Sequence, residues 1–347
     1  MKNVHLVIAD LFLPKDFGAS VGLHLPALEK ILARGASTSS AQVTSSFDAS
    51  GGSARTISLE DVLCELFRVA GGFAPIAAAF DGLEPGCWLR ADPVHVRLQR
   101  EQVVLLPNVV VSAEEAALLC TSLNEHFVNQ GMQFFAPHPD RWYVRLDELP
   151  EIITVPLSQA SGRNIHGNLP TGIDEKRWHQ LFNEIQMLLF AHPVNEAREG
   201  RGEVPVNSVW FWGEGSEVAA TSQSASASSD EVLAEMLASA AKIPFSVWQP
   251  AWRNSLSPNV ERELLIFTGL RSSLQQGDLS GWRSALQDFE TGYAKPLWQA
   301  LRSGEIATLQ FDVLGGDGMH RISLTRADAW AFWRGSRRLA DVLPAND

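Results

Sequence analysis

The sequence predicts an α/β fold: a core sheet with helices on both faces, interrupted by an inserted α+β subdomain. Strand-like and helix-like segments alternate at both ends of the chain, and a stretch of short strands and amphipathic helices separates them. The length of 347 residues suits one large α/β unit or two domains. Hydrophobic residues make up 45% of the chain, with 11 Trp and 17 Phe, so global disorder is excluded.

The start of the chain has the order strand, loop, helix. An apolar run over residues 4–9 predicts a short buried strand that ends at Asp10. Residues 25–34 carry apolar side chains on one helical face. Ser58 is typical of a helix N-cap, because the acids that follow suit the positive end of the helix dipole. This order indicates the beginning of a doubly wound sheet.

Residues 85–205 have a different pattern, of short strand-like segments and amphipathic helices, which predicts the inserted α+β subdomain. Residues 1–84 plus 206–347 then form the core. Ser112 and Glu115 have the spacing of a capping box at the start of a helix. The elements expected in this subdomain are strands over 87–96, 102–107, 134–135 and 142–146, and helices over 112–129 and 174–190.

The last third of the chain returns to alternating strands and helices. Residues 206–212 predict an apolar core strand. The Ser- and Ala-rich run over 219–229 predicts an exposed, mobile loop. The other elements expected here are strands over 264–268 and 306–313, an edge strand over 321–325, and helices over 230–241, 279–302 and 326–334.

Composition narrows the classes of partner and compartment. The net charge of −12 argues against a nucleic-acid or anionic-membrane partner, because phosphates are repelled over most of the surface. The 3 cysteines are too few and too scattered for a disulfide framework or a Cys-rich zinc site. No apolar run is long enough to span a membrane, and the first residues do not have the pattern of a signal peptide. We therefore expect a cytoplasmic protein with no nucleic-acid or membrane partner.

Three positions carry candidate chemistry when judged by their own residues. Asp10 lies at the predicted carboxyl end of the first strand, the edge where open α/β sheets bind ligands. It is either a metal-binding acid or a loop acid that caps a neighbouring amide. Ser58 is either a nucleophile or an ordinary helix cap. Arg90 and the arginines near it predict a solvated strand face rather than an anion-binding edge.

The segment from His192 to Gly215 is the most specific part of the sequence. It contains His-Pro-Val-Asn over 192–195 and Val-Trp-Phe-Trp-Gly-Glu-Gly over 209–215. Its polar residues, Asn207 among them, either dock the insertion onto the core or bind a ligand. The segment resembles the archaeal-type cofactor-independent phosphoglycerate mutases, which belong to the alkaline phosphatase superfamily. This resemblance implies an alkaline-phosphatase-like core that carries an α+β insertion domain.

The chain is also similar to a set of bacterial proteins described as RpfE-type regulatory or phosphoglycerate-mutase-like proteins. The shared segments are Leu-Arg-Ala-Asp-Pro-Val-His over 89–95, Pro-His-Pro-Asp-Arg-Trp-Tyr over 137–143, and Asn-Glu-Ile-Gln-Met-Leu-Leu over 183–189. This second resemblance implies a bacterial protein with a regulatory role.

The mutases hold two divalent metals and attack phosphate with a serine. The resemblance places Asp10 at a metal-binding position and Ser58 at the position of that serine. In the mutases an Asp follows the serine directly, whereas this chain has Leu59.

The C-terminal half departs further from the mutase pattern. Arg271 and Gln275 stand where the resemblance calls for Asp and His ligands, and Asp312 ends a strand where an Asp-His pair is expected. A guanidinium inside a two-metal site is electrostatically incompatible with binding both ions.

The resemblance and its departures together imply a degenerate, non-catalytic relative with no cofactor. We expect it to bind a small anionic metabolite, such as a phosphorylated one, or a protein partner in a regulatory role. The expected ligand-binding residues are Arg271, His192, Asn195, Arg198 and Asn207.

Two alternatives remain open at this stage. In the first, the chain is a metal-dependent phosphomutase or phosphatase with Ser58 as nucleophile. Asp10 and Asp312 then hold a divalent metal such as Mn, Mg or Zn. In the second, the chain is a structural partner protein that uses a Trp-rich surface.

Overall fold

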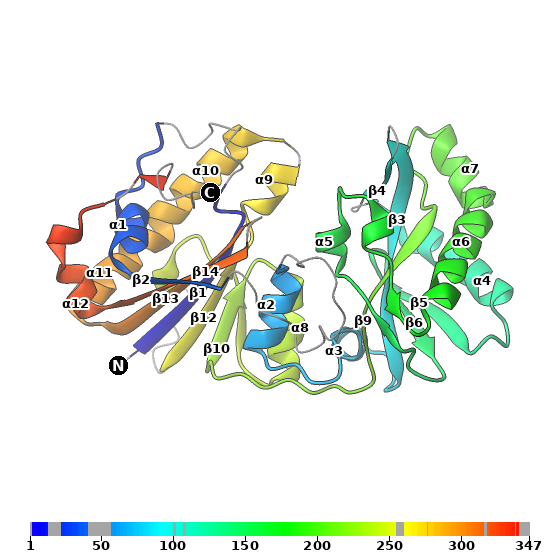
Figure 1. The fold of residues 1–347 in the computed structure, drawn as a ribbon, viewed down its shortest axis with the longest axis horizontal. Coiled ribbons are helices and arrows are strands. Elements are labelled where there is room, and N and C mark those ends of the chain that lie inside the picture. The colour runs from blue at the N-terminus through cyan, green and yellow to red at the C-terminus, as the bar shows by residue number, and fades with distance from the viewer. Residues whose placement is uncertain are drawn as a thin grey trace. The chain divides into compact units, whose positions relative to one another are not determined.

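The computed structural model describes residues 2–12, 22–40, 57–99, 102–106, 109–254, 260–275, 277–315, 318–336 and 338–339. The chain divides into two compact units (Figure 1). Unit 1 comprises the described residues of 1–67 and 222–347, and unit 2 comprises those of 68–221. The insertion therefore begins before residue 85 and ends after residue 205, because α3 (Ala74–Phe80) and β9 (Ser208–Gly215) pack with the sheet of unit 2.

Unit 1 is built on a seven-stranded sheet with the order β11-β10-β12-β1-β13-β14-β2. Its strands β11, β10, β12, β1 and β13 are parallel, and β14 runs antiparallel to both of its neighbours, β13 and β2. Parallel strands buried between layers have near-continuous apolar sequences, as β12 does. The strand bounds are β1 (Lys2–Ala9), β2 (Ala36–Ser40), β10 (Ser226–Ser229), β11 (Phe245–Val247), β12 (Arg262–Phe267), β13 (Ile306–Gly315) and β14 (Gly318–Thr325).

The helices of unit 1 bury the apolar residues of this sheet. Val4, Leu6 and Ile8 of β1 face a core shared with α1, α10 and α11. The intervening β1 residues face the other side because side chains alternate along a strand. The helix bounds are α1 (Pro26–Arg34), α2 (Leu59–Leu66), α8 (Val232–Ala240), α9 (Arg271–Gln275), α10 (Leu279–Phe289), α11 (Lys295–Ser303) and α12 (Arg326–Trp330). The chain is thus a mixed α/β fold, as the sequence predicted.

Unit 2 is an α+β unit with a five-stranded antiparallel sheet of order β4-β3-β6-β5, in which β9 also pairs with β3. Apolar residues of this sheet and of α4, α6 and α7 form a second core. The strands are β3 (Cys87–Gln99), β4 (Gln102–Leu106), β5 (Met132–His138) and β6 (Arg141–Leu146), with the short pair β7 (Ile152–Ile153) and β8 (Thr171–Gly172). The remaining helices are α4 (Ala113–His126), α5 (Leu157–Ala160), α6 (Glu175–Phe190) and α7 (Pro193–Gly200).

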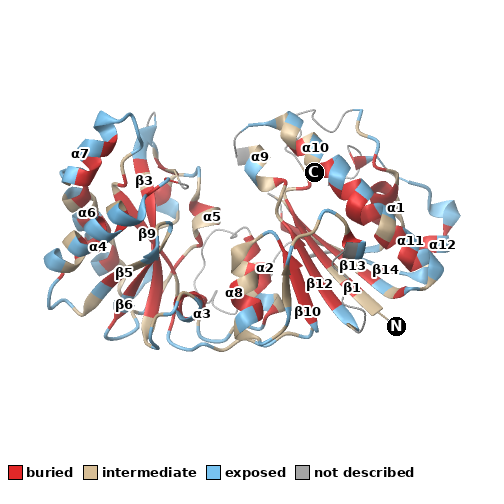
Figure 2. Ribbon diagram, turned by 180° about the vertical axis from the view of Figure 1, so that it is seen from behind, coloured by how far each residue is buried: buried red, intermediate tan, exposed pale blue. Residues whose placement is uncertain are grey.

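Three expectations about strands were wrong. The strand expected in the core from residue 206 is β9, which pairs with β3 in unit 2. The Ser-rich run is no loop at its end, since Ser226–Ser229 form the buried strand β10 between β11 and β12 (Figure 2, red). Small side chains fit this crowded position, and both sides of the strand are hydrogen-bonded to neighbours. Finally, β14 is not an edge strand, because β2 pairs with its outer side.

The predicted helix over 279–302 is present in three parts. A π-helical turn over Glu290–Ala294 joins α10 to α11. The carboxylate of Glu290 accepts hydrogen bonds from the backbone N–H groups of Ala27 and Leu28, at 2.7 and 3.0 Å. Glu290 therefore caps α1, whose own N-cap residue Leu25 has no polar side chain. Across the described residues, no helix combines the length and apolar character that a membrane span requires.

Candidate functional site

The candidate site lies where parallel strands of unit 1 end together. Asp10 follows β1, Asp230 follows β10, and Thr268 begins the turn after β12 that leads into α9 and Arg271. The register pairs β1 with β12 and β12 with β10 along parallel directions, so the three carboxyl ends share one edge of the sheet. Ligands of open α/β folds collect at this edge.

Asp10 and Arg271 form an ion pair at this edge. The Nε of Arg271 donates to Oδ2 of Asp10 at 3.0 Å. The side chain of Arg271 is 23% exposed and that of Asp10 is 35% exposed. The backbone of Asp10 is left-handed, with φ at 59°. Its N–H donates to the carbonyl of Leu314, and its carbonyl accepts from the indole of Trp282. A non-glycine residue held in this conformation stores backbone strain, which concentrates at functional sites.

Arg271 is surrounded by carboxyl groups. Burial lowers its pKa, but the charges of Asp10 and Glu60 outweigh burial and raise the pKa above the ordinary arginine value. Burial raises the pKa of both Asp230 and Glu231, and the charge of Arg271 offsets part of that rise. One guanidinium therefore provides the positive charge for several acids at this partly exposed edge.

Ser58 is the N-cap of α2, as the sequence predicted. Its Oγ accepts from the N–H of Asp61 at 3.1 Å and donates to Oδ2 of Asp61 at 2.7 Å. The same carboxylate accepts from the N–H of Ser58, which completes a capping box. The hydroxyl is buried and already bonded to a neighbour in its own helix.

Asp312 lies within β13 and is fully buried. Arg321 from β14 donates to its two carboxylate oxygens at 2.9 and 2.8 Å, and Nε2 of His5 lies 2.7 Å from Oδ2. Burial raises the pKa of this carboxyl, but its hydrogen bonds with His5 and Arg321 outweigh burial and bring the pKa below the ordinary value. Both oxygens of Asp312 are thus occupied by protein groups.

These side chains do not fit a two-metal centre. Asp10 and Asp312 each bind an arginine, and the side chain of Gln275 lies outside the described residues. In the part of the chain that the structure describes, no three His, Cys, Asp or Glu side chains are grouped as metal ligands. A divalent ion at either aspartate would have to displace a guanidinium.

The four other predicted site residues lie in unit 2, whereas Asp10 and Arg271 belong to unit 1. Asn195 joins the end of α6 to the segment before β9: Nδ2 donates to the carbonyls of Leu189 and Val206, and Oδ1 accepts from the N–H of Val206. Asn207 exchanges two hydrogen bonds with the backbone of Val96. Both amides bond the backbone of unit 2 itself, so these hydrogen bonds do not dock the insertion onto the core as one interpretation expected.

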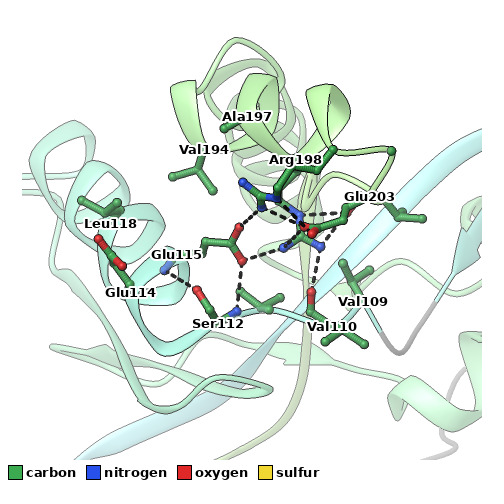
Figure 3. A pocket seen from close by; sticks show the side chains of 14 residues that line it. Val109, Val110, Ser112, Glu114, Glu115, Leu118, Val194, Ala197, Arg198 and Glu203 are labelled. Carbon is green, nitrogen blue, oxygen red and sulfur yellow. Dashed lines mark hydrogen bonds and ion pairs between the residues drawn. The ribbon is translucent and has the colours of Figure 1, made fainter.

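His192 and Arg198 also make internal contacts. Nδ1 of His192 accepts from the N–H of Val194, and its Nε2 lies 2.9 Å from the hydroxyl of Ser122. Arg198 donates to Glu115 and to the carbonyls of Val110 and Val204, beside a pocket of about 1010 Å³ (Figure 3). Its donors therefore stabilise the junction between α4 and α7.

Arg90 corrects the expectation of a solvated strand face. It is buried, with its guanidinium 5.0 Å from the ring of Tyr143 and 5.6 Å from the ring of Trp212. It binds the carboxylate of Asp92, which also accepts from the indole of Trp212 at 2.6 Å. Sequence alternation offered a signal for this pair, because Arg90 and Asp92 lie two residues apart on one strand face.

Comparison with known proteins finds partial sequence matches to one kind of enzyme. No protein-family profile matches the chain. The 2,3-bisphosphoglycerate-independent phosphoglycerate mutase of Methanosarcina barkeri is 32% identical over 108 residues, which are 30% of this chain and 27% of that protein. The corresponding enzyme of Methanosarcina acetivorans is 27% identical over 151 residues, 42% of this chain and 37% of that protein. Over these partial matches the chain is similar to 2,3-bisphosphoglycerate-independent phosphoglycerate mutases, and it spans well under half of the length of either relative.

One solved structure shows the same fold at low sequence identity, and a second aligns less closely. The PH0037 protein from Pyrococcus horikoshii aligns over 98% of this chain and 92% of its own, with a TM-score of 0.53 and 13% identity. The cofactor-independent phosphoglycerate mutase of Thermoplasma acidophilum aligns over 100% of this chain and 96% of its own, with a TM-score of 0.49 and 15% identity. The likeness to the PH0037 protein shows a shared fold and no more.

Proposed function

We propose that this chain is a non-catalytic phosphoglycerate-mutase-like protein that acts by binding, in a regulatory role. One observation carries the proposal: the two aspartates at expected metal positions, Asp10 and Asp312, are each bound to an arginine. A guanidinium supplies a single fixed positive charge and no open coordination position. It cannot generate a bound hydroxide or bridge two phosphate oxygens as a metal ion does.

The charges at the sheet edge bear on the class of ligand. Arg271 is the expected anion-binding residue, but Asp10, Glu60 and Glu231 already share its charge. A phosphate approaching this edge meets those carboxylates as well as the guanidinium. The four expected ligand-binding residues of unit 2 make hydrogen bonds within the unit. Of the two proposed ligand classes, these contacts favour a protein partner over a small phosphorylated metabolite.

The central test is metal-dependent phosphotransfer. We expect the purified chain to contain no stoichiometric Mn, Mg or Zn by elemental analysis. Its melting temperature should stay the same with a chelator or with added Mn²⁺. With 3-phosphoglycerate and Mn²⁺, no phosphotransfer should be measured. Ser58→Ala and Ser112→Ala are matched variants, because both remove the serine of a capping box.

Each cap variant should lower the free energy of unfolding by about 1 kcal/mol. Neither substitution should change the measured phosphotransfer, which is expected to be absent in the wild type. Mn²⁺-dependent transfer that disappears in Ser58→Ala and persists in Ser112→Ala would establish the metal-dependent phosphomutase or phosphatase instead. A thermal shift with inorganic phosphate or 3-phosphoglycerate that is lost in Arg271→Met would assign the ligand to the metabolite class.

A further inference from the structure

Three large aromatic side chains are exposed together near the end of unit 1. Trp330 of α12 is 53% exposed, and the following Phe332 and Trp333 are 78% and 74% exposed. The rings of Phe332 and Trp333 meet edge to face, 5.4 Å apart. Other tryptophans pack in the interior, and those that are fully buried are Trp88, Trp142, Trp210, Trp252 and Trp282. Contiguous exposed aromatics are unusual on a protein surface and mark interaction sites.

The backbone that carries these rings is anchored to α1. Nη1 and Nε of Arg34 donate to the carbonyls of Ala329 and Gly335 at 3.0 and 3.2 Å. Arg334 donates back to the carbonyl of Arg34 at 2.6 Å. Ala331, between the exposed rings, is buried. The aromatic side chains therefore project from a fixed support, which lowers the entropy cost of binding.

The surroundings of the rings are positively charged although the chain is acidic. The described residues of 326–338 contain three arginines and one aspartate, in a chain of net charge −12. The guanidinium of Arg302 lies 4.6 Å from the ring centroid of Trp330, and Arg326 and Arg338 are exposed. Trp and Arg are the residue types that dominate binding energy at protein interfaces.

We propose that this aromatic–arginine patch binds an acidic peptide segment of another protein. The patch is defined here by Trp330, Phe332 and Trp333 with Arg302, Arg326 and Arg338. The occupant carries Asp or Glu for the arginines and apolar side chains for the rings. The proposal goes beyond the loss of catalysis and does not depend on it.

Charge and area favour a peptide over other occupants. At 150–250 Å² for each aromatic side chain, the exposed rings offer roughly 400 Å². A standard interface buries about 800 Å² per partner, so these rings alone suit a short segment. A second copy placed patch to patch would set arginines against arginines. An anionic bilayer would extend beyond the patch and face the acidic remainder of the chain, whereas a peptide contacts only the patch.

The test uses the full chain and a library of short random peptides displayed on phage. We expect selected peptides to be enriched in acidic and apolar residues, with binding that weakens as salt rises. A labelled selected peptide should bind the double variant Phe332→Ser/Trp333→Ser about tenfold or more weakly. Arg326→Glu/Arg338→Glu should weaken it by a similar factor. Phe190→Ser is the matched control, because Phe190 is 80% exposed in unit 2, and it should bind like the wild type.

All substituted side chains are exposed, so unchanged circular dichroism and melting temperature should verify folding. Selected peptides that lack acids, or that bind the aromatic double variant as tightly as the wild type, would overturn the proposal. Sedimentation that reveals a dimer lost in that variant would assign the patch to a second copy. Cosedimentation with phosphatidylserine-containing vesicles, lost in the same variant, would assign it to a membrane. Failure of peptide binding leaves the metal and phosphotransfer results unaffected, so the two proposals fail separately.

Discussion

The two aspartate–arginine pairs of unit 1 have the same chemistry and different surroundings. Asp312 and Arg321 form a two-point contact in which the carboxylate is fully buried and also bound to His5. Asp10 and Arg271 share one hydrogen bond at the carboxyl edge of the sheet, and both side chains are partly exposed. The first pair crosses between neighbouring strands β13 and β14, and the second links a strand end to α9. The carboxylate of the first pair is therefore closed to solvent, although Arg321 is 34% exposed, whereas both members of the second pair are partly accessible.

The largest expected effect comes from breaking the pair whose carboxylate is buried. Arg321→Met leaves the carboxylate of Asp312 inside the protein with His5 as its remaining bonded partner. Removing one member of a buried pair costs about 3 kcal/mol or more, because the other charge stays desolvated. We expect the urea midpoint of unfolding to fall accordingly, with an unchanged slope if the native state stays compact.

The double variant Asp312→Asn/Arg321→Met is the matched control. It removes both charges, so its loss of stability should be smaller than the sum of the losses in the two single variants. Additive losses would mean that the pair is not coupled, and the distinction drawn here between the two pairs would then fail.

The pH dependence of stability should sharpen the same distinction. The folded-state pKa of Asp312 lies below its ordinary value, so this carboxylate stabilises the fold above the unfolded-state pKa of about 4. That contribution is lost as the pH falls through the lower, folded-state pKa. The wild type should therefore lose more stability on acidification than Asp312→Asn, as measured by urea unfolding at a series of acidic pH values. Parallel stability curves would contradict the assignment.

Local sequence signals predicted much of the fold. The apolar run of β1, the helical stripe of α1, the N-cap at Ser58 and the capping box at Ser112 depend on neighbours a few residues apart, and the structure contains each of them. Composition was a poor guide at Ser226–Ser229, because burial there is decided by pairing with two distant strands.

At the candidate site, too, the features with a sequence signal were predicted, and the contacts between segments distant in sequence were not. The resemblance to the mutases drew attention to Asp10 and Arg271, and the structure brings them within 3.0 Å of each other. Their ligand-binding role stays a prediction. The bond from His5 to Asp312 joins residues 307 apart in sequence, and the sheet register that aligns them has no local signature. The burial of Arg90 likewise required knowing that Trp212 lies on the adjacent strand.

The smallest expected effect comes from the exposed pair. Arg271→Met should cost about 1 kcal/mol at neutral pH, since solvent screens a partly exposed pair. The carboxyl groups it leaves behind give this variant its own pH signature. Asp230 and Glu231 already have raised pKa values through burial, and removal of the Arg271 charge should raise both further.

Groups whose folded-state pKa lies above the unfolded value take up protons on folding, so they favour the folded state as the pH falls. The stability deficit of Arg271→Met should therefore shrink between neutral and mildly acidic pH, in urea unfolding against wild type. Arg253→Met is the matched control, because Arg253 pairs with Glu305 at 3.2 Å on an exposed surface, and its small deficit should stay constant. If the deficit of Arg271→Met is also constant with pH, the carboxyl groups at the sheet edge do not depend on the guanidinium. Arg271 would then be free to bind a phosphate at this edge.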